Sequence, residues 1–407
     1  MKYYGSPRWS GEICDCSMPM TFDTYNLCSY RCLYCFSFFQ RSINTHAYLN
    51  DNVRWVNPEK VMRIFTDPDS SPFGPYVKQR LAMQWGGLSD QFDEHERERG
   101  ITLGLLKFFR AIQYPISFST KAAWWTEDER YVSLFRGADH FNLKFSIITL
   151  DEEKARKVEV LVPSPEERLK AMARAASWGI GGVTLRLRPF IIGVTTPSYL
   201  ELIERAAGAG AEAVSTEFVC IEKRSKKARR RFEAIGRVAG YDLLKMYTKA
   251  SKGQSGYLRG SREMKRPYID AMQEKCDKLG LRFYVSDAHF KERCANGSCC
   301  GLRPDWNYSR GQFTEALVIA KEKGQVRWAD IVPGLEYLGS VKEGVINIGN
   351  APNSWSPYHG MGMVGWIHHQ WNNVNGRRSP YKYFGGVLHP IGRDESGDVI
   401  YEYRGDI

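Results

Sequence analysis

Three cysteines, Cys28, Cys32 and Cys35, lie within eight residues of one another with the spacing C-x3-C-x2-C. Thiolates this close together suit a soft metal or an iron–sulfur cluster. A structural zinc site would need four protein ligands, and no further cysteine or histidine lies close by in the sequence. A [4Fe-4S] cluster held by three cysteines keeps one iron open for a small chelating molecule. We therefore interpret the motif as the ligands of such a cluster; three buried thiols or a zinc knuckle are the alternatives.

The composition places this motif in a chain that can bury a substantial core. The sequence has 407 residues, of which 43% are hydrophobic, and this length allows one large domain or two ordinary ones. It contains ten cysteines, no apolar run of about 18 residues and, at its start, no apolar core of a signal peptide. These features predict a cytoplasmic, reducing location without a membrane partner. They also predict cysteines that bind metal rather than form disulfides.

The segments around the motif alternate between strand and helix patterns, and the cysteine loop directly follows the first predicted strand. Such alternation is typical of βα units with a parallel sheet. Six strands predict an α/β fold, a partial (β/α)6 TIM-like barrel, with its chemistry at the carboxyl ends of the strands. The predicted strands span residues 18–27, 81–85, 115–119, 141–149, 183–189 and 213–220, and the predicted helices span 101–112, 164–178 and 198–207.

This pattern divides the chain into four predicted parts. Residues 1–17 form an N-terminal segment, and residues 18–220 form the barrel. Residues 221–301 contain a basic insertion, a last barrel strand at 281–286 and a cysteine-rich loop. Residues 302–407 are rich in Trp, Tyr, Asn and Gly and lack a clear period, which predicts an irregular or short-stranded α+β extension packed on the barrel mouth.

Residues 221–266 carry a local positive charge. They contain 15 basic and 4 acidic residues, and this excess equals the net charge of +11 of the whole chain. Basic side chains neutralise phosphates, and the interleaved aromatic residues could stack on bases. We therefore predict a nucleic-acid partner for this segment, with Arg229, Arg230 and Arg231 as contacts. The alternative is a solvated helix face beside a loop.

Two further groups of cysteines lie outside the first motif. Cys14 and Cys16 precede the barrel, whereas Cys294, Cys299 and Cys300 follow the strand at 281–286. Grouped thiols of this kind suit a second metal site, for which a second iron–sulfur cluster is one candidate. The two groups can share one site only if the N-terminal segment folds back along the barrel. Otherwise the last three thiols would need His289 or a substrate as a further ligand. The alternative is that Cys299 and Cys300 are a reduced, buried pair.

Residues 20–200 resemble the spore photoproduct lyase branch of the radical S-adenosylmethionine (SAM) superfamily. The motif Cys28-x3-Cys32-x2-Cys35, with Tyr34 before its last cysteine, is similar to the signature of that superfamily. The resemblance covers under half of the chain and fades after Cys220. The other matching pieces are residues 87–92 with Glu96, residues 100–102, residues 119–121, residues 146–151, and residues 163–168 ahead of residues 186–189.

The resemblance implies an enzyme that holds SAM on the open iron of its cluster. Reduction, by a donor such as flavodoxin or ferredoxin, would cleave SAM to a 5′-deoxyadenosyl radical that abstracts a hydrogen atom from a substrate. Tyr34 would then be a catalytic and SAM-binding residue. The remaining SAM-binding residues implied by position are Gly86 and Gly87 for the amino group, Ser119, Lys121 and Ser146 near the ribose or carboxylate, and Arg186 or Arg188 for the carboxylate.

One departure from the resemblance concerns the reaction itself. In the lesion-repair enzymes, a cysteine inside the barrel returns a hydrogen atom to the product. This sequence has no cysteine between Cys35 and Cys220, so Cys220 is the candidate donor, with the pair Cys299 and Cys300 as an alternative. Three functions therefore stay open: repair or modification of a nucleic acid, modification of a peptide or small molecule, and metal-stabilised binding of a nucleic acid without catalysis.

Overall fold

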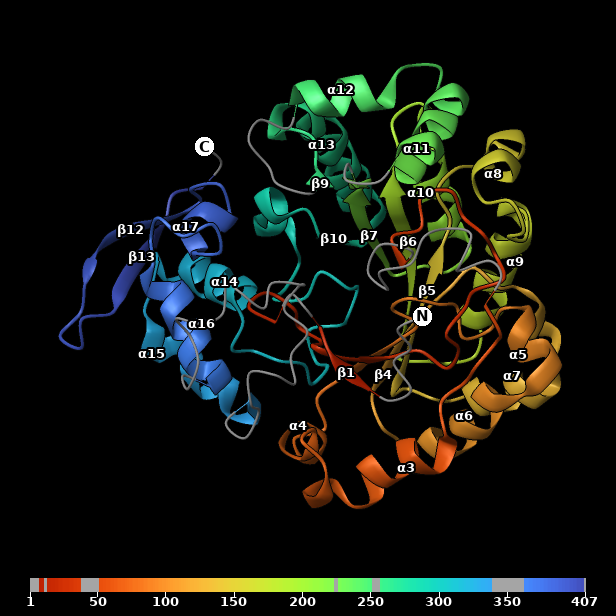
Figure 1. The fold of residues 1–407 in the computed structure, drawn as a ribbon, viewed down its shortest axis with the longest axis horizontal. Helices are drawn as coiled ribbons and strands as arrows, with labels where there is room; N and C mark the ends of the chain where they lie inside the picture. The colour runs from red at the N-terminus through yellow and green to blue at the C-terminus, as the bar shows by residue number, and fades with distance from the viewer. Residues whose placement is uncertain are drawn as a thin grey trace.

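The computed structural model describes residues 7–10, 13–37, 51–222, 226–250, 257–338 and 362–405, and for residues 226–228 only the backbone. Its central element is a sheet of eight strands with the order β1-β2-β3-β4-β5-β6-β7-β10 (Figure 1). The strand β1 is antiparallel to β2, and each later neighbour pairs in parallel. The strands are β1 (Arg8–Trp9), β2 (Met20–Phe22), β3 (Met83–Trp85), β4 (Ile116–Thr120), β5 (Phe141–Ser146), β6 (Gly182–Phe190), β7 (Ala213–Phe218) and β10 (Arg282–Val285).

Helices connect these strands and cover the outer face of the sheet (Figure 1). The helix α9 begins as predicted, because Ser164 and Glu167 form a reciprocal capping box with Pro165 at the first helical position. The α/β barrel-type fold is therefore confirmed, with seven parallel strands because β10 joins the edge of β7. The covering helices are α3 (Pro58–Thr66), α4 (Gly74–Lys78), α5 (Glu94–Arg99), α6 (Ile101–Ala111), α7 (Glu129–Phe135), α8 (Glu152–Val158), α9 (Pro165–Ala176), α10 (Tyr199–Gly208) and α13 (Arg262–Leu279).

The strands alternate between an apolar face and a polar face. In β5, for example, Phe141, Leu143 and Phe145 are fully buried in the core beneath the helices. The residues between them are polar, and the parallel register aligns them with polar residues of the neighbouring strands. We call this second surface the polar face. Its members are Gln84, Ser117, Ser119, Asn142, Lys144, Ser146, Thr184, Arg186, Arg188, Ser215 and Glu217.

The first strand is shorter than predicted. The sequence pattern predicts a strand over residues 18–27, whereas β2 ends at Phe22. The next residue, Asp23, accepts hydrogen bonds from the backbone N–H groups of Leu88 (2.6 Å) and Ser89 (2.9 Å). The carboxylate thus fixes the turn after β3, and the chain leaves the sheet at this point to form the cysteine loop.

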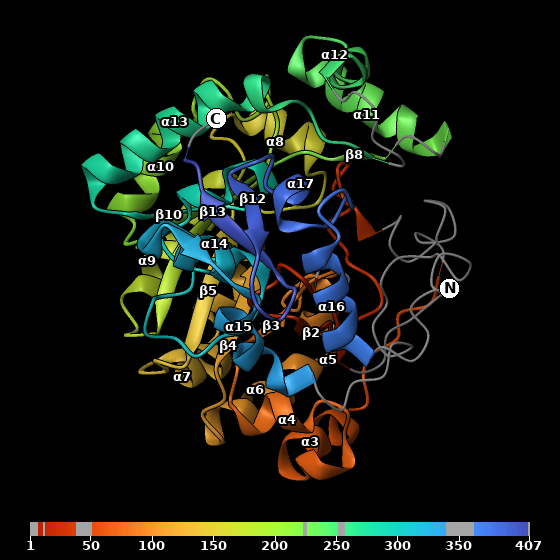
Figure 2. The same ribbon diagram turned by 90° about the vertical axis from the view of Figure 1, so that its left-hand side faces the viewer.

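The basic insertion folds as a helical pair on a short two-stranded base. The strands β8 (Ile221–Glu222) and β9 (Tyr257–Leu258) pair antiparallel and flank α11 (Lys226–Ala239) and α12 (Leu243–Ala250). The helix α11 packs against α8, and Figure 2 shows both insertion helices at one end of the molecule. The insertion therefore lies beside α8.

The C-terminal region forms an α+β unit beside the barrel, as predicted for its fold (Figure 1). Its sheet has the order β11-β13-β12 and is antiparallel. The side chain of Trp371 is buried in this unit and packs edge-on against Tyr401, with ring centres 4.9 Å apart. The described ranges contain no helix with the length and hydropathy to cross a membrane. The unit comprises α14 (Phe313–Lys323), β11 (Gln325–Val326), α15 (Trp328–Ile331), α16 (Gly362–Asn372), α17 (Pro380–Tyr383), β12 (Leu388–Arg393) and β13 (Val399–Tyr403).

Candidate active site

The cysteine loop lies at the carboxyl end of β2 and is fixed by its backbone. The N–H of Ser29 donates to the carboxylate of Asp93 (2.7 Å), and the N–H of Leu33 donates to the carbonyl of Val158 (2.9 Å). Within the loop, the N–H of Cys35 donates to the carbonyl of Cys32 (3.1 Å). The loop is thus attached to elements on both of its sides, which holds the three cysteines in a defined position.

Tyr34 is anchored by a buried ion pair. Its hydroxyl donates to Glu159, which forms an ion pair of 2.8 Å with Arg168, and both charged side chains are at most 1% exposed. Arg168 also donates to the carbonyl of Ser146 (2.7 Å) at the end of β5. The tyrosine hydroxyl is therefore engaged by protein groups. Only its ring faces the site, with the Lys121 ammonium 5.8 Å from the ring centre.

The three thiols are close enough to influence one another. Burial raises the pKa of Cys28 well above its usual value, with added repulsion from Asp93. Burial also raises the pKa of Cys32 to about 12, and repulsion from Cys35 contributes. Buried thiols of this kind ionise when a metal supplies the compensating positive charge. Across the described ranges, no three His, Cys, Asp or Glu side chains are grouped around a position for a single metal ion.

A cluster of several irons offers each thiolate its own iron, so its ligands need not converge on one point. The loop fits such a group, because its three thiols are adjacent, outside any disulfide, and only partly covered at Cys28 and Cys35. Cys28, Cys32 and Cys35 are the residues that would hold it.

The turn after β3 requires glycine at two positions. Gly86 has a φ of +87°, and a Cβ at this position would lie 2.1 Å from the side-chain oxygen of Gln91. A Cβ at Gly87 would lie 3.0 Å from the hydroxyl of Thr21. The ion pair between Arg8 and Asp23 (2.7 Å) supports the same turn. The absence of side chains at Gly86 and Gly87 therefore lets Gln91 and Thr21 pack directly against the turn.

Three buried polar atoms beside this turn lack a partner within the part of the chain that the structure describes. The amide nitrogen and oxygen of Gln91 and the hydroxyl of Thr21 are buried and lack a hydrogen-bond partner among the described residues. Gln91 is fully buried, so an unsatisfied amide would cost free energy on the order of 1–3 kcal/mol per group. A polar ligand at Gly86 and Gly87 would satisfy these groups. Sequence reasoning missed Gln91, although it stands in the segment 87–92 that carries the resemblance.

The ends of β4, β5 and β6 form one hydrogen-bonded network. The hydroxyl of Ser119 accepts from Arg186 (2.5 Å) and from the side-chain amide of Gln84 (3.1 Å), and Lys144 donates to Gln84. Arg188, two residues after Arg186, forms an ion pair with Glu217 on β7. Both arginines therefore lie on the polar face, as their spacing predicts.

This network leaves excess positive charge inside the fold. Lys144 is 2% exposed, and its hydrogen-bond partner is the neutral side chain of Gln84. Burial lowers the pKa of Lys144 to about 8, and burial together with the neighbouring Arg188 lowers that of Arg186 to about 10. An anionic ligand would offset the cost of these buried cations. Sequence reasoning missed Lys144; the signal that could have found it is a lysine on the same face of the predicted strand as Asn142 and Ser146.

The carboxyl ends of β4 and β5 position two further residues of the predicted SAM site, Lys121 and Ser146. Asp90 accepts from the backbone N–H of Lys121 (2.6 Å) and from the hydroxyl of Thr120 (2.9 Å), which fixes the chain after β4. Ser146 is 3% exposed at the end of β5, next to Arg186 in the parallel register. Lys121 and Ser146 therefore stand at the same edge of the sheet as the cysteine loop.

The loop with Cys299 and Cys300 runs along the polar face. The hydroxyl of Ser215 donates to the carbonyl of Cys299 (3.0 Å), and that of Thr184 to the carbonyl of Gly301 (3.4 Å). The chain order alone, with the loop directly after β10, indicates a position at the carboxyl rim of the barrel. The side-chain donors on β6 and β7 instead draw the loop inward along the sheet.

Cys220 lies two residues beyond the end of β7. Its thiol approaches the carbonyl of Phe218 at 4.0 Å. Burial raises its pKa to about 11, whereas the positive charge of Arg259 and Lys265 lowers it. The thiol thus faces a charged region near the base of the insertion, and its role as a hydrogen-atom donor stays a prediction.

Arg231 contacts the cysteine loop. Its guanidinium donates to the carbonyl of Cys32 (2.6 Å) and to that of Cys35 (3.5 Å). This half-buried side chain therefore attaches α11 to the cysteine loop, and its role as a nucleic-acid contact stays a prediction. Arg229 and Arg230, the two residues before it, are exposed.

Comparisons with known proteins bear on the fold. No protein-family model matches the sequence, and no curated protein matches it. A solved structure of a spore photoproduct lyase variant is 17% identical, with a TM-score of 0.50 over 66% of this chain and 77% of that chain. Spore photoproduct lyase complexed with dinucleoside spore photoproduct is 18% identical, with a TM-score of 0.49 over the same shares. Streptococcus suis SuiB bound to S-adenosylmethionine is 14% identical, with a TM-score of 0.40 over 68% of this chain and 52% of that chain. At 17% identity, the likeness to the structure with the TM-score of 0.50 shows a shared fold alone.

Proposed function

We propose that this chain is a radical SAM enzyme that acts on a nucleic acid, in repair or in modification of a base. The observation that carries the proposal is the juxtaposition at one sheet edge of a three-cysteine loop and a glycine turn with unsatisfied polar atoms. The cysteines would hold the cluster, and the turn at Gly86 and Gly87 would receive the polar end of SAM beside Gln91. When bound, the cluster would supply one electron, from a donor such as flavodoxin or ferredoxin, for cleavage of SAM to a 5′-deoxyadenosyl radical.

The residues around the loop would orient SAM and keep water from the reacting atoms. Arg186 is half-buried in the middle of β6, beside the last residue of β5, with the neutral partner Ser119, so its guanidinium suits a carboxylate. Arg188 is already paired with Glu217, which favours Arg186 for this contact. Lys121 stands over the ring of Tyr34, on the cysteine-loop side of the same edge. Cys220 is the proposed hydrogen-atom donor at the end of β7.

The insertion supports a nucleic-acid substrate. Its two helices carry exposed cations, and few acidic residues offset them. Arg231 attaches this basic surface directly to the cysteine loop, so a polyanion bound there would lie next to the proposed cluster. Cations at this position would neutralise phosphates and guide the strand to the sheet edge. The described exposed cations are Arg229, Arg230, Arg237, Lys245 and Lys249.

Charge reversal on α11 should weaken nucleic-acid binding. In the double variant Arg229→Glu and Arg230→Glu, we expect an affinity for single-stranded DNA or RNA lower by about tenfold or more at low salt. The slope of log K against log salt should fall by roughly 1 to 2, because each lost phosphate contact removes ~0.7 for a single strand. Fluorescence anisotropy across a salt series measures both quantities.

Two control variants make this test specific. The double variant Lys107→Glu and Lys170→Glu carries the same change in charge on exposed positions of α6 and α9, and it should bind normally. Arg231→Gln should disturb cluster assembly more than binding, since its partners are loop carbonyls. Equal binding by the α11 variant and the α6/α9 variant would remove the support for a nucleic acid and favour a small-molecule or peptide substrate.

A further inference from the structure

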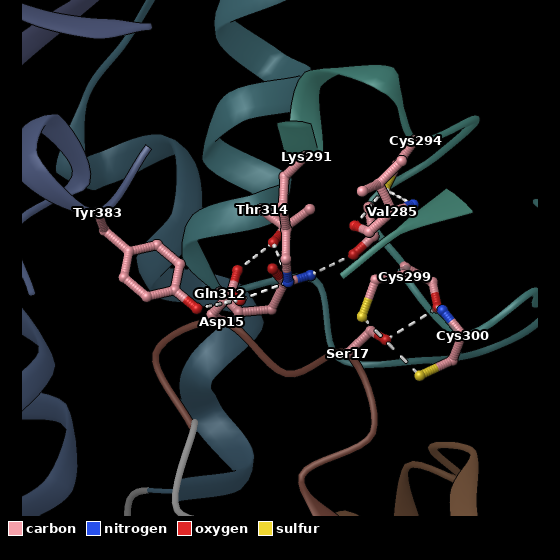
Figure 3. A network of polar contacts seen from close by, with 12 residues as sticks. Asp15, Ser17, Val285, Lys291, Cys294, Cys299, Cys300, Gln312, Thr314 and Tyr383 are labelled. Carbon is pink, nitrogen blue, oxygen red and sulfur yellow. Dashed lines mark hydrogen bonds and ion pairs between the residues drawn. The ribbon is translucent and has the colours of Figure 1, made fainter. Parts of the chain in front are cut away.

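The N-terminal segment folds back along the barrel and meets the cysteine-rich loop. The backbone N–H of Phe313 donates to the carbonyl of Cys14 (2.6 Å), and the N–H of Ser309 donates to the carbonyl of Ser17 (3.0 Å). The hydroxyl of Ser17 donates to that of Ser298 (3.0 Å), which also accepts from the N–H of Cys300. Figure 3 shows Ser17 beside Cys299 and Cys300. The condition for the two cysteine groups to share one site is therefore met.

Four thiols from these two segments lie in one region of the fold. The sulfurs of Cys299 and Cys300 lie 3.9 Å apart. The thiol of Cys294, in the same loop, accepts from the backbone N–H of Val285 (3.2 Å) and donates to its carbonyl (3.3 Å). Cys16 is next to Ser17, whose hydroxyl donates to Ser298, the residue before Cys299. All four thiols are outside disulfides and intermediate in exposure, so they are neither sealed in the core nor fully in solvent. We call this group the second thiol cluster.

The charges around the second thiol cluster suit an anionic centre. Lys291 is buried and forms an ion pair with Asp15, the residue before Cys16 (Figure 3). Tyr383 of α17 donates to the same carboxylate (2.8 Å), which holds the segment in place. The ammonium of Lys144 on the polar face is also buried, and its hydrogen-bond partner among the described residues is the neutral Gln84. Several thiolates bound to irons carry net negative charge, which this surrounding would stabilise.

We propose that Cys16, Cys294, Cys299 and Cys300 are the ligands of a second iron–sulfur cluster, separate from the site of Cys28, Cys32 and Cys35. Four cysteines match the ligand set of a [4Fe-4S] cluster. With four protein ligands, this cluster has no open iron, so it does not bind SAM. Its position on the polar face suits a carrier of single electrons. The inference does not depend on the substrate proposed above.

The surroundings of two nearby residues exclude them as ligands of the second cluster. Cys14 is buried in the main core, and its charged neighbours are Arg378 and Asp15. His289 is the further ligand considered from the sequence, and its ring packs against Gly385 after α17. A Cβ on Gly385 would lie 3.2 Å from the nearest ring atom of His289. Cys14 is therefore a matched control, since it is two residues from Cys16 and belongs to the same segment.

Iron and sulfide counting on the anaerobically reconstituted full chain tests the proposal. Wild type and Cys14→Ser should hold about eight irons, and Cys16→Ser and the double variant Cys294→Ser with Cys299→Ser about four. The triple variant Cys28→Ala, Cys32→Ala and Cys35→Ala should also keep about four, now in a cluster whose EPR spectrum does not respond to SAM. If the first cluster does not bind SAM, only the effect of SAM on the EPR spectrum changes, and the iron counts of the variants stay as predicted. The two proposals are therefore tested separately.

If the cysteine variants do not fold, thiol alkylation followed by peptide mass spectrometry tests the proposal on the wild-type protein. In reconstituted wild type, Cys16 and Cys294 should be protected from the reagent and should become reactive after iron is removed. A wild-type content of about four irons, all lost in the triple variant, would overturn the proposal. Bound zinc in place of iron, or unchanged reactivity of Cys16 after chelation, would also overturn it.

Discussion

Replacing Cys32 by alanine should abolish the SAM-binding cluster and reduce SAM cleavage to the background level. Cys32 is the central cysteine of the loop, and its carbonyl also accepts hydrogen bonds from Cys35 and Arg231. Removing its thiol leaves two ligands where three irons need one each. Absorbance near the cluster bands, EPR of the reduced protein and iron content measure the loss.

The matched control for this variant is Cys276→Ala. Cys276 is fully buried in α13 and has a thiol of the same kind, but it lies on the outer helix layer. This variant should lower stability by an amount typical of a small cavity and leave both SAM cleavage and cluster spectra intact. Full SAM cleavage by Cys32→Ala would contradict the assignment of the loop.

A large loss of stability is expected when the buried ion pair between Glu159 and Arg168, which supports Tyr34, is broken. Glu159→Ala should lower the free energy of unfolding by about 3–5 kcal/mol, because it leaves the guanidinium of Arg168 buried without its counter-ion. The pair is 2.8 Å apart and at most 1% exposed, so water cannot take over the lost contact. The hydroxyl of Tyr34 also loses its acceptor. Urea unfolding of the cluster-free protein measures the change.

Glu153→Ala provides the comparison for this loss. Glu153 pairs with Lys157 one helical turn away in α8, but both side chains are more than half exposed. Such a pair contributes roughly 0.3–0.5 kcal/mol, so its removal should barely shift the unfolding midpoint. Equal midpoints for the two variants would show that the buried pair does not hold the loop. A Tyr34→Phe variant, which keeps the ring, should lose much less stability than Glu159→Ala.

The parts of the site that could be predicted from sequence are those set by local spacing. Three cysteines in eight residues define the loop, and the two-residue period of a strand puts Arg186 and Arg188 on one face. The capping box of α9 is likewise local, since Ser164 and Glu167 are three residues apart. Each of these features depends on residues close together in the chain, so the sequence alone specifies it.

The features that sequence reasoning missed depend on contacts between distant segments. No local pattern shows that Arg231 reaches the carbonyl of Cys32, or that Ser17 meets Ser298. The buried Lys144 reads as an ordinary surface charge until the sheet register places it beside Ser119 and Thr184. The inward course of the cysteine-rich loop follows from side chains on β6 and β7, which the chain order does not reveal.

The central claim is that this fold cleaves SAM reductively at the three-cysteine loop. The most direct test is the amount of 5′-deoxyadenosine formed when reconstituted enzyme is incubated anaerobically with SAM and a strong one-electron reductant. We predict 5′-deoxyadenosine that depends on the reductant and is absent from the Cys28→Ala, Cys32→Ala and Cys35→Ala triple variant. No 5′-deoxyadenosine from folded, iron-loaded wild type, or equal amounts from wild type and the triple variant, would contradict the account.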